Sequence, residues 1–282
     1  PDNPYLSRSP ESPSNRKTWT WSCWFKTTLV GTTAGQSPTL LYTDNFQLYV
    51  LESATSPYQD ELIVYQGGVI LNTTMKFKDP AAWYHIVVSI DTTQSVSTDR
   101  LRCWVNGIAQ TFSAYAAPTQ DADMNMNQTG QTSQIGANEL TADYFDGVMA
   151  HTHWTDGYSY VATDFGEFDS TSGIWVAKSG PSVSYGTNGF FLKYASGALG
   201  TDSSGNGNDF TVSGTATNTK DTPDNNFATW NPLIYGASSL TLANGNNAIT
   251  DVADTSYHSI SVSYTHLRAH ETLRYLVCRL LL

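Results

Sequence analysis

Two acidic residues, Glu167 and Asp169, have the spacing at which side chains of a β-strand share one face. A retaining glycosidase needs a pair of carboxylates that face one cleft a few ångströms apart. Here Ser172 occupies the position where a further glutamate would complete a catalytic strand, and Gly166 and Gly173 flank the segment. We therefore predict a surface turn in this segment and expect that the chain is not an enzyme.

His151 and His153 have the same spacing, and two imidazoles on one strand face can hold a transition metal. The sequence offers no nearby Cys or Glu as a third ligand, although Asp146 or Asp156 could supply one in space. Without a complete ligand set, ordinary hydrogen-bonded strand histidines are the favoured interpretation.

An oxygen-rich segment, Asp-Ser-Ser-Gly-Asn-Gly-Asn-Asp, runs from Asp202 to Asp209. Calcium prefers carboxylate and amide oxygens, so calcium is the candidate cofactor here. The segment lacks the glutamate that closes an EF-hand loop, because Ser213 stands at that position. A Gly/Asn turn between strands explains the same residues without a metal, and both interpretations stay open. The candidate calcium ligands are Asp202, Asn206, Asn208 and Asp209.

Tyrosines in polar or glycine-flanked segments are the candidates for ligand binding. Their rings can stack on the apolar faces of sugars while neighbouring polar groups supply hydrogen bonds. The tyrosines in such segments are Tyr58, Tyr115, Tyr158 and Tyr160. The tryptophans within strand patterns are expected in the core, namely Trp19, Trp21, Trp83 and Trp104.

The composition restricts both the fold and the partners. Charged residues make up 14% of the 282 residues, against about 25% in an average soluble protein, while aromatic residues reach 12%. This mixture disfavours helical bundles and favours short strands joined by polar turns. The net charge of -11 repels a phosphate backbone, so no nucleic-acid partner is expected. No apolar run is long enough to cross a bilayer, so no membrane partner is expected either.

Short strand patterns separated by turn signals fill the chain. Asn106-Gly107 is a strong hairpin signal, and residues 114–134 form a polar stretch that we expect to be a long surface loop. The pattern predicts an all-β fold, an antiparallel β-sandwich or jelly roll. The predicted strands are Thr18–Phe25, Thr39–Tyr42, Phe46–Leu51, Glu61–Tyr65, Trp83–Asp91, Arg100–Val105 and Tyr144–Trp154.

Cys23 and Cys103 lie inside apolar strand patterns, where a free cysteine acts as a small buried hydrophobe. A disulfide between them stays open as an alternative.

Two strand patterns carry a resemblance to a known family. Trp83-Tyr-His-Ile-Val-Val88 precedes Leu101-Arg-Cys-Trp-Val-Asn-Gly107, and this pair resembles the central strands of laminin-G-like domains of the concanavalin A-like superfamily. The resemblance implies a concanavalin A-like jelly roll and a lectin-like, carbohydrate-binding role. Trp83 and His85 would then point to one face. Such domains often bind calcium at the rim of the sandwich.

Further segments resemble the laminin-G-like domains of tailed-bacteriophage virion proteins. They include Asp164-Phe-Gly-Glu-Phe-Asp169, Tyr185-Gly-Thr-Asn-Gly-Phe-Phe-Leu192 and Asp221-Thr-Pro-Asp-Asn-Asn-Phe227. The resemblance implies a phage tail protein that attaches to host-surface glycans, located in the virion or outside the cell. The alternatives are a structural spacer or decoration domain that binds other virion proteins, and a secreted bacterial glycan-binding or glycosidase domain. A homo-oligomer is also an expected assembly.

The same reasoning divides the chain into segments. The sandwich is expected over residues 1–180, an extension and Gly/Asn/Ser-rich linker over 181–231, and the truncated start of a second, SPRY-like β-sandwich over 232–261. Residues 262–282 resemble a translated sequencing adapter, so we expect them to be an artefact. The chain begins with Pro1 and not with Met, which we interpret as the edge of a fragment.

Overall fold

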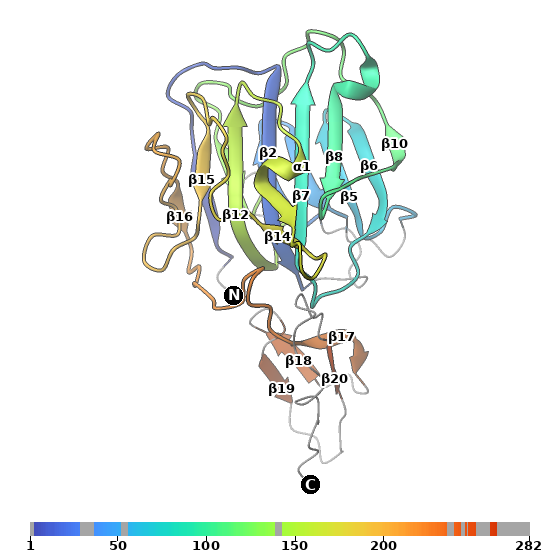
Figure 1. Cartoon of the computed structure of the whole chain (residues 1–282). Helices are drawn as coiled ribbons and strands as arrows, with labels where there is room; N and C mark the ends of the chain where they lie inside the picture. The colour runs from blue at the N-terminus through green and yellow to red at the C-terminus, as the bar shows by residue number, and fades with distance from the viewer. Residues whose placement is uncertain are drawn as a thin grey trace.

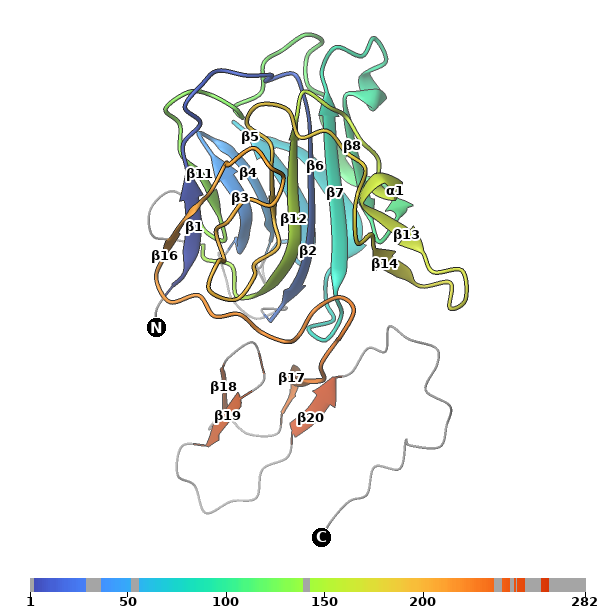
Figure 2. The same ribbon diagram turned by 60° about the vertical axis from the view of Figure 1, so that its left-hand side comes forward.

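The computed structural model describes residues 3–28, 37–51, 56–138, 143–235, 240–243, 246, 248–251 and 260–263. Two antiparallel β-sheets lie face to face and form a sandwich (Figures 1 and 2). The eight-stranded sheet has the spatial order β10 (Phe112–Tyr115), β6 (Val69–Lys76), β5 (Glu61–Gln66), β4 (Phe46–Val50), β3 (Thr39–Thr43), β11 (Ser133–Ile135), β1 (Tyr5–Arg8) and β16 (Thr211–Ser213). The six-stranded sheet has the order β15 (Phe190–Leu192), β12 (Gly147–Asp156), β2 (Thr18–Thr27), β7 (Tyr84–Asp91), β8 (Leu101–Val105) and β9 (Ile108–Ala109).

Strand β2 shows why the sequence forms this core. Its residues alternate between the two faces of the sheet, so Trp19, Trp21, Cys23 and Phe25 all point into the space between the sheets and are buried there. Burying a large apolar side chain stabilises the fold by about 1.5–3 kcal/mol relative to leaving it in water. The predicted all-β fold class, an antiparallel β-sandwich, is therefore confirmed.

The outer face of the six-stranded sheet is also partly buried. A short helix, α1 (Ala162–Phe165), and a hairpin of β13 (Gly166–Phe168) and β14 (Trp175–Ala177) lie against it (Figure 2). They enclose a second apolar cluster, which consists of Trp24, Trp83, Val87, Ala150, Ala162, Phe165 and Trp175. A sheet that is packed on both faces explains why β7 is buried along almost its whole length.

The Asn106-Gly107 hairpin is confirmed between β8 and β9. Both residues have positive φ, 47° and 79°, as a tight turn between two antiparallel strands requires. Gly107 has a second role, because a Cβ atom there would lie 2.4 Å from the ring of Trp175. The turn and the hairpin that covers the sheet therefore depend on the same glycine.

Each predicted strand corresponds to one of β2, β3, β4, β5, β7, β8 and β12. Of the loop expected over residues 114–134, residues 116–132 contain no strand, whereas its two ends belong to β10 and β11. The structure differs from the expected boundary at residue 180. Strand β15 pairs with β12, and β16 pairs with β1, so residues 190–213 complete both sheets of the sandwich. Their strands are three residues long, too short to give a clear alternating pattern.

Beyond the sandwich, four strands form two small sheets: β17 (Thr229–Tyr235) pairs with β20 (Ile260–Ser263), and β18 (Leu240–Ala243) pairs with β19 (Ala248–Asp251). They lie past one end of the sandwich (Figure 1). Residues 264–282, which hold most of the segment that resembles an adapter, are outside the described residues.

Cys23 and Cys103 are both buried and free. Burial raises the pKa of each thiol to about 12, which agrees with their role as small core side chains.

Candidate ligand-binding surface

The segment that follows β12, residues 157–161, crosses the outer face of the six-stranded sheet on its way to α1. Thr20 of β2 holds it at two points: its Oγ1 donates to the carbonyl oxygen of Tyr158 at 3.0 Å and accepts from the amide of Tyr160 at 2.8 Å. Further across the sheet, the Oγ atoms of Ser159 and Ser89 lie 2.7 Å apart. The segment is thus fixed to β2 and β7 by hydrogen bonds.

Tyr158 and Tyr160 form a stacked pair on this segment. Their ring centroids are 5.9 Å apart with an interplanar angle of 22°. Tyr158 is 43% exposed, whereas Tyr160 is half-buried against Phe165 and accepts a 2.8 Å hydrogen bond from the amide of Ser184. One ring therefore supports the other and leaves it in contact with solvent.

Arg102 and Trp104 continue this surface on β8. Their neighbours Leu101, Cys103 and Val105 point into the core, so alternation places both side chains on the outer face. The guanidinium carbon of Arg102 lies 5.3 Å from the centroid of the Trp104 ring, within the range of a cation–π contact. We call Arg102, Trp104, Tyr158 and Tyr160 together the aromatic surface.

Ser159 joins the two parts of the aromatic surface. Its Oγ accepts a 3.1 Å hydrogen bond from Nη2 of Arg102, and the residue itself lies between the two tyrosines. Flat rings beside a planar cation can bind a sugar ring by stacking and by hydrogen bonding at once. Trp104, which was expected in the core, is half-buried on this face against the second apolar cluster, and Arg102 was not among the predicted binding residues. The alternation of Leu101–Val105 was the signal that could have identified both as outer-face residues.

The other two tyrosines with predicted binding roles lie elsewhere. Tyr58 is 41% exposed on the connection before β5. Tyr115 of β10 stacks on Phe112 at 5.3 Å, and its hydroxyl donates to the carbonyl oxygens of Ser97 and Leu101. The fold therefore brings together Tyr158 and Tyr160 but neither Tyr58 nor Tyr115.

The neighbouring part of the same sheet face lies under α1 and the β13–β14 hairpin. There His85 stacks between Trp24 at 4.8 Å and Trp175 at 5.9 Å. Its Nδ1 accepts a 2.9 Å hydrogen bond from Nε1 of Trp175, and its Nε2 is 2.8 Å from Oγ of Ser22. Burial, together with the charge of His151, lowers the pKa of His85 to about 3, so the ring is neutral. The prediction that Trp83 and His85 share one face is confirmed.

His151 and His153 do not form a metal site with the described acids. A bulge in β12 gives His151 a positive φ of 46°. His153 stacks on Phe191 at 3.9 Å, and its Nδ1 is 2.9 Å from the hydroxyl oxygen of Tyr185. Among the described residues, no three His, Cys, Asp or Glu side chains converge as a metal-ligand set. His153 thus has the hydrogen-bonding role that the sequence favoured, whereas His151 stacks on Phe191 at 6.1 Å.

The oxygen-rich segment is a loop closed by its own donors. Asp202 accepts four hydrogen bonds, from the amides of Phe191, Ser204 and Asn208 and from the hydroxyl of Ser204, at 2.8–2.9 Å. Asp209 accepts one from the amide of Asp202. These donors occupy the lone pairs that a calcium ion would need.

The two asparagines of the predicted calcium set also have structural contacts. The Nδ2 atoms of Asn206 and Asn208 both donate to the carbonyl oxygen of Gly189, and Arg8 donates to Oδ1 of Asn208. The two asparagines therefore hold the loop against residues 186–189, the two aspartates close the loop, and a calcium site remains a prediction.

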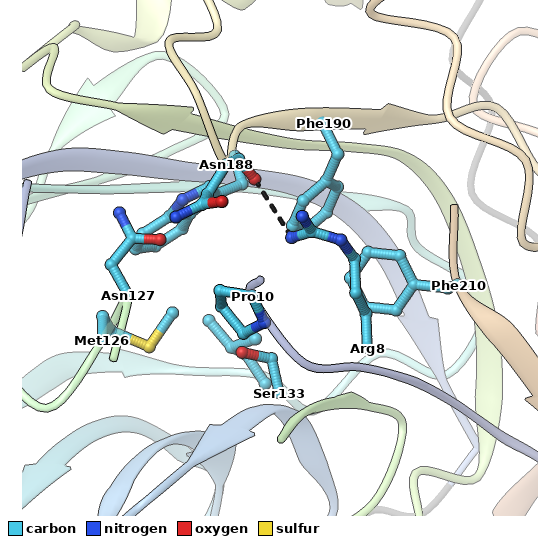
Figure 3. A pocket seen from close by; sticks show the side chains of 10 residues that line it. Arg8, Pro10, Met126, Asn127, Ser133, Asn188, Phe190 and Phe210 are labelled. Atoms are coloured by element: carbon cyan, nitrogen blue, oxygen red, sulfur yellow. Dashed lines mark hydrogen bonds between the residues drawn. The ribbon is translucent and has the colours of Figure 1, made fainter. Parts of the chain in front are cut away.

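A small cavity of about 10 Å³ lies between the sheets near this loop. Figure 3 shows the Arg8 guanidinium next to Phe190, with a 3.4 Å hydrogen bond to the carbonyl oxygen of Asn188. This volume is about that needed by one water molecule, so the cavity cannot hold a sugar ring.

Glu167 and Asp169 lie on the β13–β14 hairpin. Glu167 is exposed on the edge strand, and Oδ1 of Asp169 accepts hydrogen bonds from the amides of Thr171 and Ser172. The predicted surface turn is confirmed. None of the helices in the described part of the chain has the length and apolarity to cross a membrane.

Two solved structures are similar to this chain at low sequence identity. The native heptameric SAP-like pentraxin from Limulus polyphemus is 14% identical, with a TM-score of 0.39 over 64% of this chain and 88% of that chain. Domain 4 of AbnA, a GH43 extracellular arabinanase from Geobacillus stearothermophilus in complex with arabinotriose, is 14% identical, with a TM-score of 0.37 over 54% of this chain and 67% of that chain. No curated protein matches the chain. A laminin-G family model, described as the concanavalin A-like lectin/glucanases superfamily, matches residues 3–158, so the chain belongs to this superfamily.

Proposed function

We propose that the chain is a non-catalytic carbohydrate-binding domain whose binding site is the aromatic surface. The observation that carries this proposal is the stacked pair of Tyr158 and Tyr160, held on the sheet by Thr20 and continued by Trp104 and Arg102. The site is built before the ligand arrives, because the backbone of residues 158–160 is fixed by hydrogen bonds. Such preorganisation reduces the entropic cost of binding.

The composition of the aromatic surface supports a non-catalytic role. A glycosidase needs two carboxylates that flank the bond to be cut. The aromatic surface consists of one cation and three aromatic rings. Glu167 and Asp169 lie on the covering hairpin, where Asp169 closes the turn.

The test is a glycan-array screen of the full chain, followed by calorimetric titration of the best glycan. The matched variants are Tyr158→Ala and Tyr58→Ala, since the two rings are 43% and 41% exposed but only Tyr158 lies in the aromatic surface. Loss of one stacking ring is expected to weaken Kd about ten-fold for Tyr158→Ala, and Tyr58→Ala is expected to leave Kd unchanged.

Two results would overturn the proposal. One is a folded chain that binds no glycan on the array. The other is a glycan whose affinity falls with Tyr58→Ala but not with Tyr158→Ala, because this would place the site on the connection before β5.

We further propose that the domain serves in a phage tail protein and attaches the virion to host-surface glycans outside the cell. The support is the resemblance of residues 164–169, 185–192 and 221–227 to phage virion domains. Binding of the full chain to intact bacteria, and its competition by the soluble array glycan, would test this role. Binding that the soluble glycan does not reduce would contradict it.

A structural spacer is the second candidate, and one contact favours it. Lys26 of β2 is buried, and its Nζ donates to Asp221, Asn226 and the carbonyl oxygen of Phe227 at 2.8–2.9 Å. Asp221 also accepts a 2.9 Å hydrogen bond from Nε1 of Trp83. The segment that leaves the sandwich for β17 is thus fixed to it, as a spacer between partner domains requires. A folded chain without any glycan ligand would favour this function.

A further inference from the structure

We infer that the ligand of the aromatic surface is an acidic saccharide, a sugar with a carboxylate or sulfate group, and that Arg102 pairs with this anion. The inference rests on the proposed function, because it specifies which carbohydrates the same site selects.

The first observation is the unbalanced charge of Arg102. In the described part of the chain the guanidinium makes one hydrogen bond, from Nη2 to the neutral hydroxyl of Ser159, and no carboxylate lies within ion-pair distance. Its Nε is shielded from water and has no acceptor among the described residues. The protein therefore leaves this charge without a counter-ion, although the chain as a whole has a net charge of -11.

Four other cations of the described chain are neutralised or bound more fully by the protein than Arg102. Lys26, Lys76 and Lys78 each pair with a carboxylate, at 2.9–3.4 Å. Each guanidinium nitrogen of Arg100 donates to a backbone carbonyl oxygen, of Gln94, Ser95 or Pro118. The half-buried guanidinium of Arg102 is fixed in position, and no carboxylate of the described chain neutralises its charge.

The second observation is how Arg102 is held. Stacking on Trp104 and the bond to Ser159 fix the guanidinium plane, so little side-chain entropy is lost when an anion binds. An arginine fork matches the geometry of a carboxylate or sulfate, and charge-assisted hydrogen bonds of this kind are stronger than neutral ones. A sugar that stacks on the tyrosine pair could present its anion to this fork.

Selection must come from this contact and not from long-range attraction. The net negative charge of the chain repels an acidic glycan at a distance. At an ionic strength of about 0.15 M the Debye length is about 8 Å, so distant charges are largely screened while the contact with Arg102 persists. Binding should therefore be measured at this ionic strength.

The test is an array of matched glycans, each printed in an acidic form and in a neutral form with the carboxylate reduced or the sulfate removed. We expect the full chain to prefer the acidic member of a pair by about ten-fold or more in Kd. The variant Arg102→Gln should lose this preference, whereas Arg102→Lys should keep part of it because the charge remains. Thermal melting of each variant controls for folding, and separate carboxylate and sulfate arms identify the anion.

The outcomes separate this inference from the proposed function. Equal binding of acidic and neutral members, with no effect of Arg102→Gln, would overturn the inference and leave the carbohydrate-binding function in place. Absence of binding to every glycan would overturn both. A preference for acidic glycans that survives Arg102→Gln in a folded variant would move the anion site away from Arg102 and also overturn the inference.

Discussion

Two neighbouring regions on the outer face of the six-stranded sheet have similar residues and different accessibility. One region holds Trp24, His85 and Trp175 under α1 and the β13–β14 hairpin, with Trp175 5% exposed. The other is the aromatic surface, where Tyr158 is 43% exposed. Both combine aromatic rings with nitrogen and hydroxyl groups. Aromatic content alone therefore does not make a binding site. Rings covered by α1 and the hairpin stabilise the fold, whereas uncovered rings are accessible to a ligand.

The substitution Trp175→Ala should give the largest difference in the free energy of unfolding between the two regions. It removes a buried ring, which costs about 3–5 kcal/mol, and leaves Nδ1 of His85 without its donor, which adds about 1 kcal/mol. Trp104→Ala, in the aromatic surface, should cost about 1 kcal/mol because the ring is half-exposed. Urea denaturation of both variants measures the free energies of unfolding. Equal losses would mean that the two regions are packed alike.

The substitution Asp221→Asn tests the buried ion pair at the end of the covered region. It leaves Lys26 buried with its charge unbalanced, and breaking a buried ion pair in this way costs about 3–5 kcal/mol. Burial lowers the pKa of Lys26 whereas Asp221 raises it, so loss of the carboxylate lowers this pKa further. The matched control is Asp123→Asn, which breaks the exposed pair with Arg16 and should cost about 0–1 kcal/mol. A small loss for Asp221→Asn would show that water replaces the carboxylate.

Acidification should weaken the covered region before it affects the aromatic surface. The folded pKa of His85 is about 3, below its ordinary value of 6.5. The unfolded chain therefore takes up a proton near pH 6.5, and the folded chain only near pH 3. The stability contributed by neutral His85 is complete above pH 6.5 and falls as the pH decreases through this window. At pH 5 the expected loss is about 2 kcal/mol, and His153, whose pKa is also lowered, adds to it.

Urea denaturation at pH 7 and pH 5 checks this expectation, with His85→Gln as the control that should reduce the pH dependence. A free energy of unfolding that stays constant between the two pH values would contradict a buried neutral His85.

Calcium should have the smallest effect on either region. A site on the folded chain, saturated at about 100 times its Kd, would raise the free energy of unfolding by about 2.7 kcal/mol. We expect no change in Tm between calcium and chelator, because donors already occupy the oxygens of Asp202. A calcium-dependent rise in Tm that Asp202→Asn abolishes would establish the predicted site.

Many strands and turns of the sandwich could be predicted from the sequence alone. Trp19-Thr-Trp-Ser22 alternates before Cys23-Trp-Phe25 becomes continuously apolar, which predicted a strand that faces a core. Asn106-Gly107 predicted a tight turn, and both signals arise from local backbone geometry. The same local rules predicted exposure of Tyr158 and the surface turn at Asp169.

Which of these residues come into contact depends on the tertiary structure. Tyr58 and Tyr158 have equivalent sequence surroundings, and only the crossing of residues 157–161 over Thr20, Ser89 and Arg102 brings Tyr158 into a surface. The burial of His85 under Trp175 depends on contacts between residues 90 positions apart. The roles of Asp202 and Asn208 as loop anchors depend on donors from residues far along the chain. Strand patterns follow from nearest-neighbour geometry, whereas a site depends on which distant segments cover a face and which leave it open.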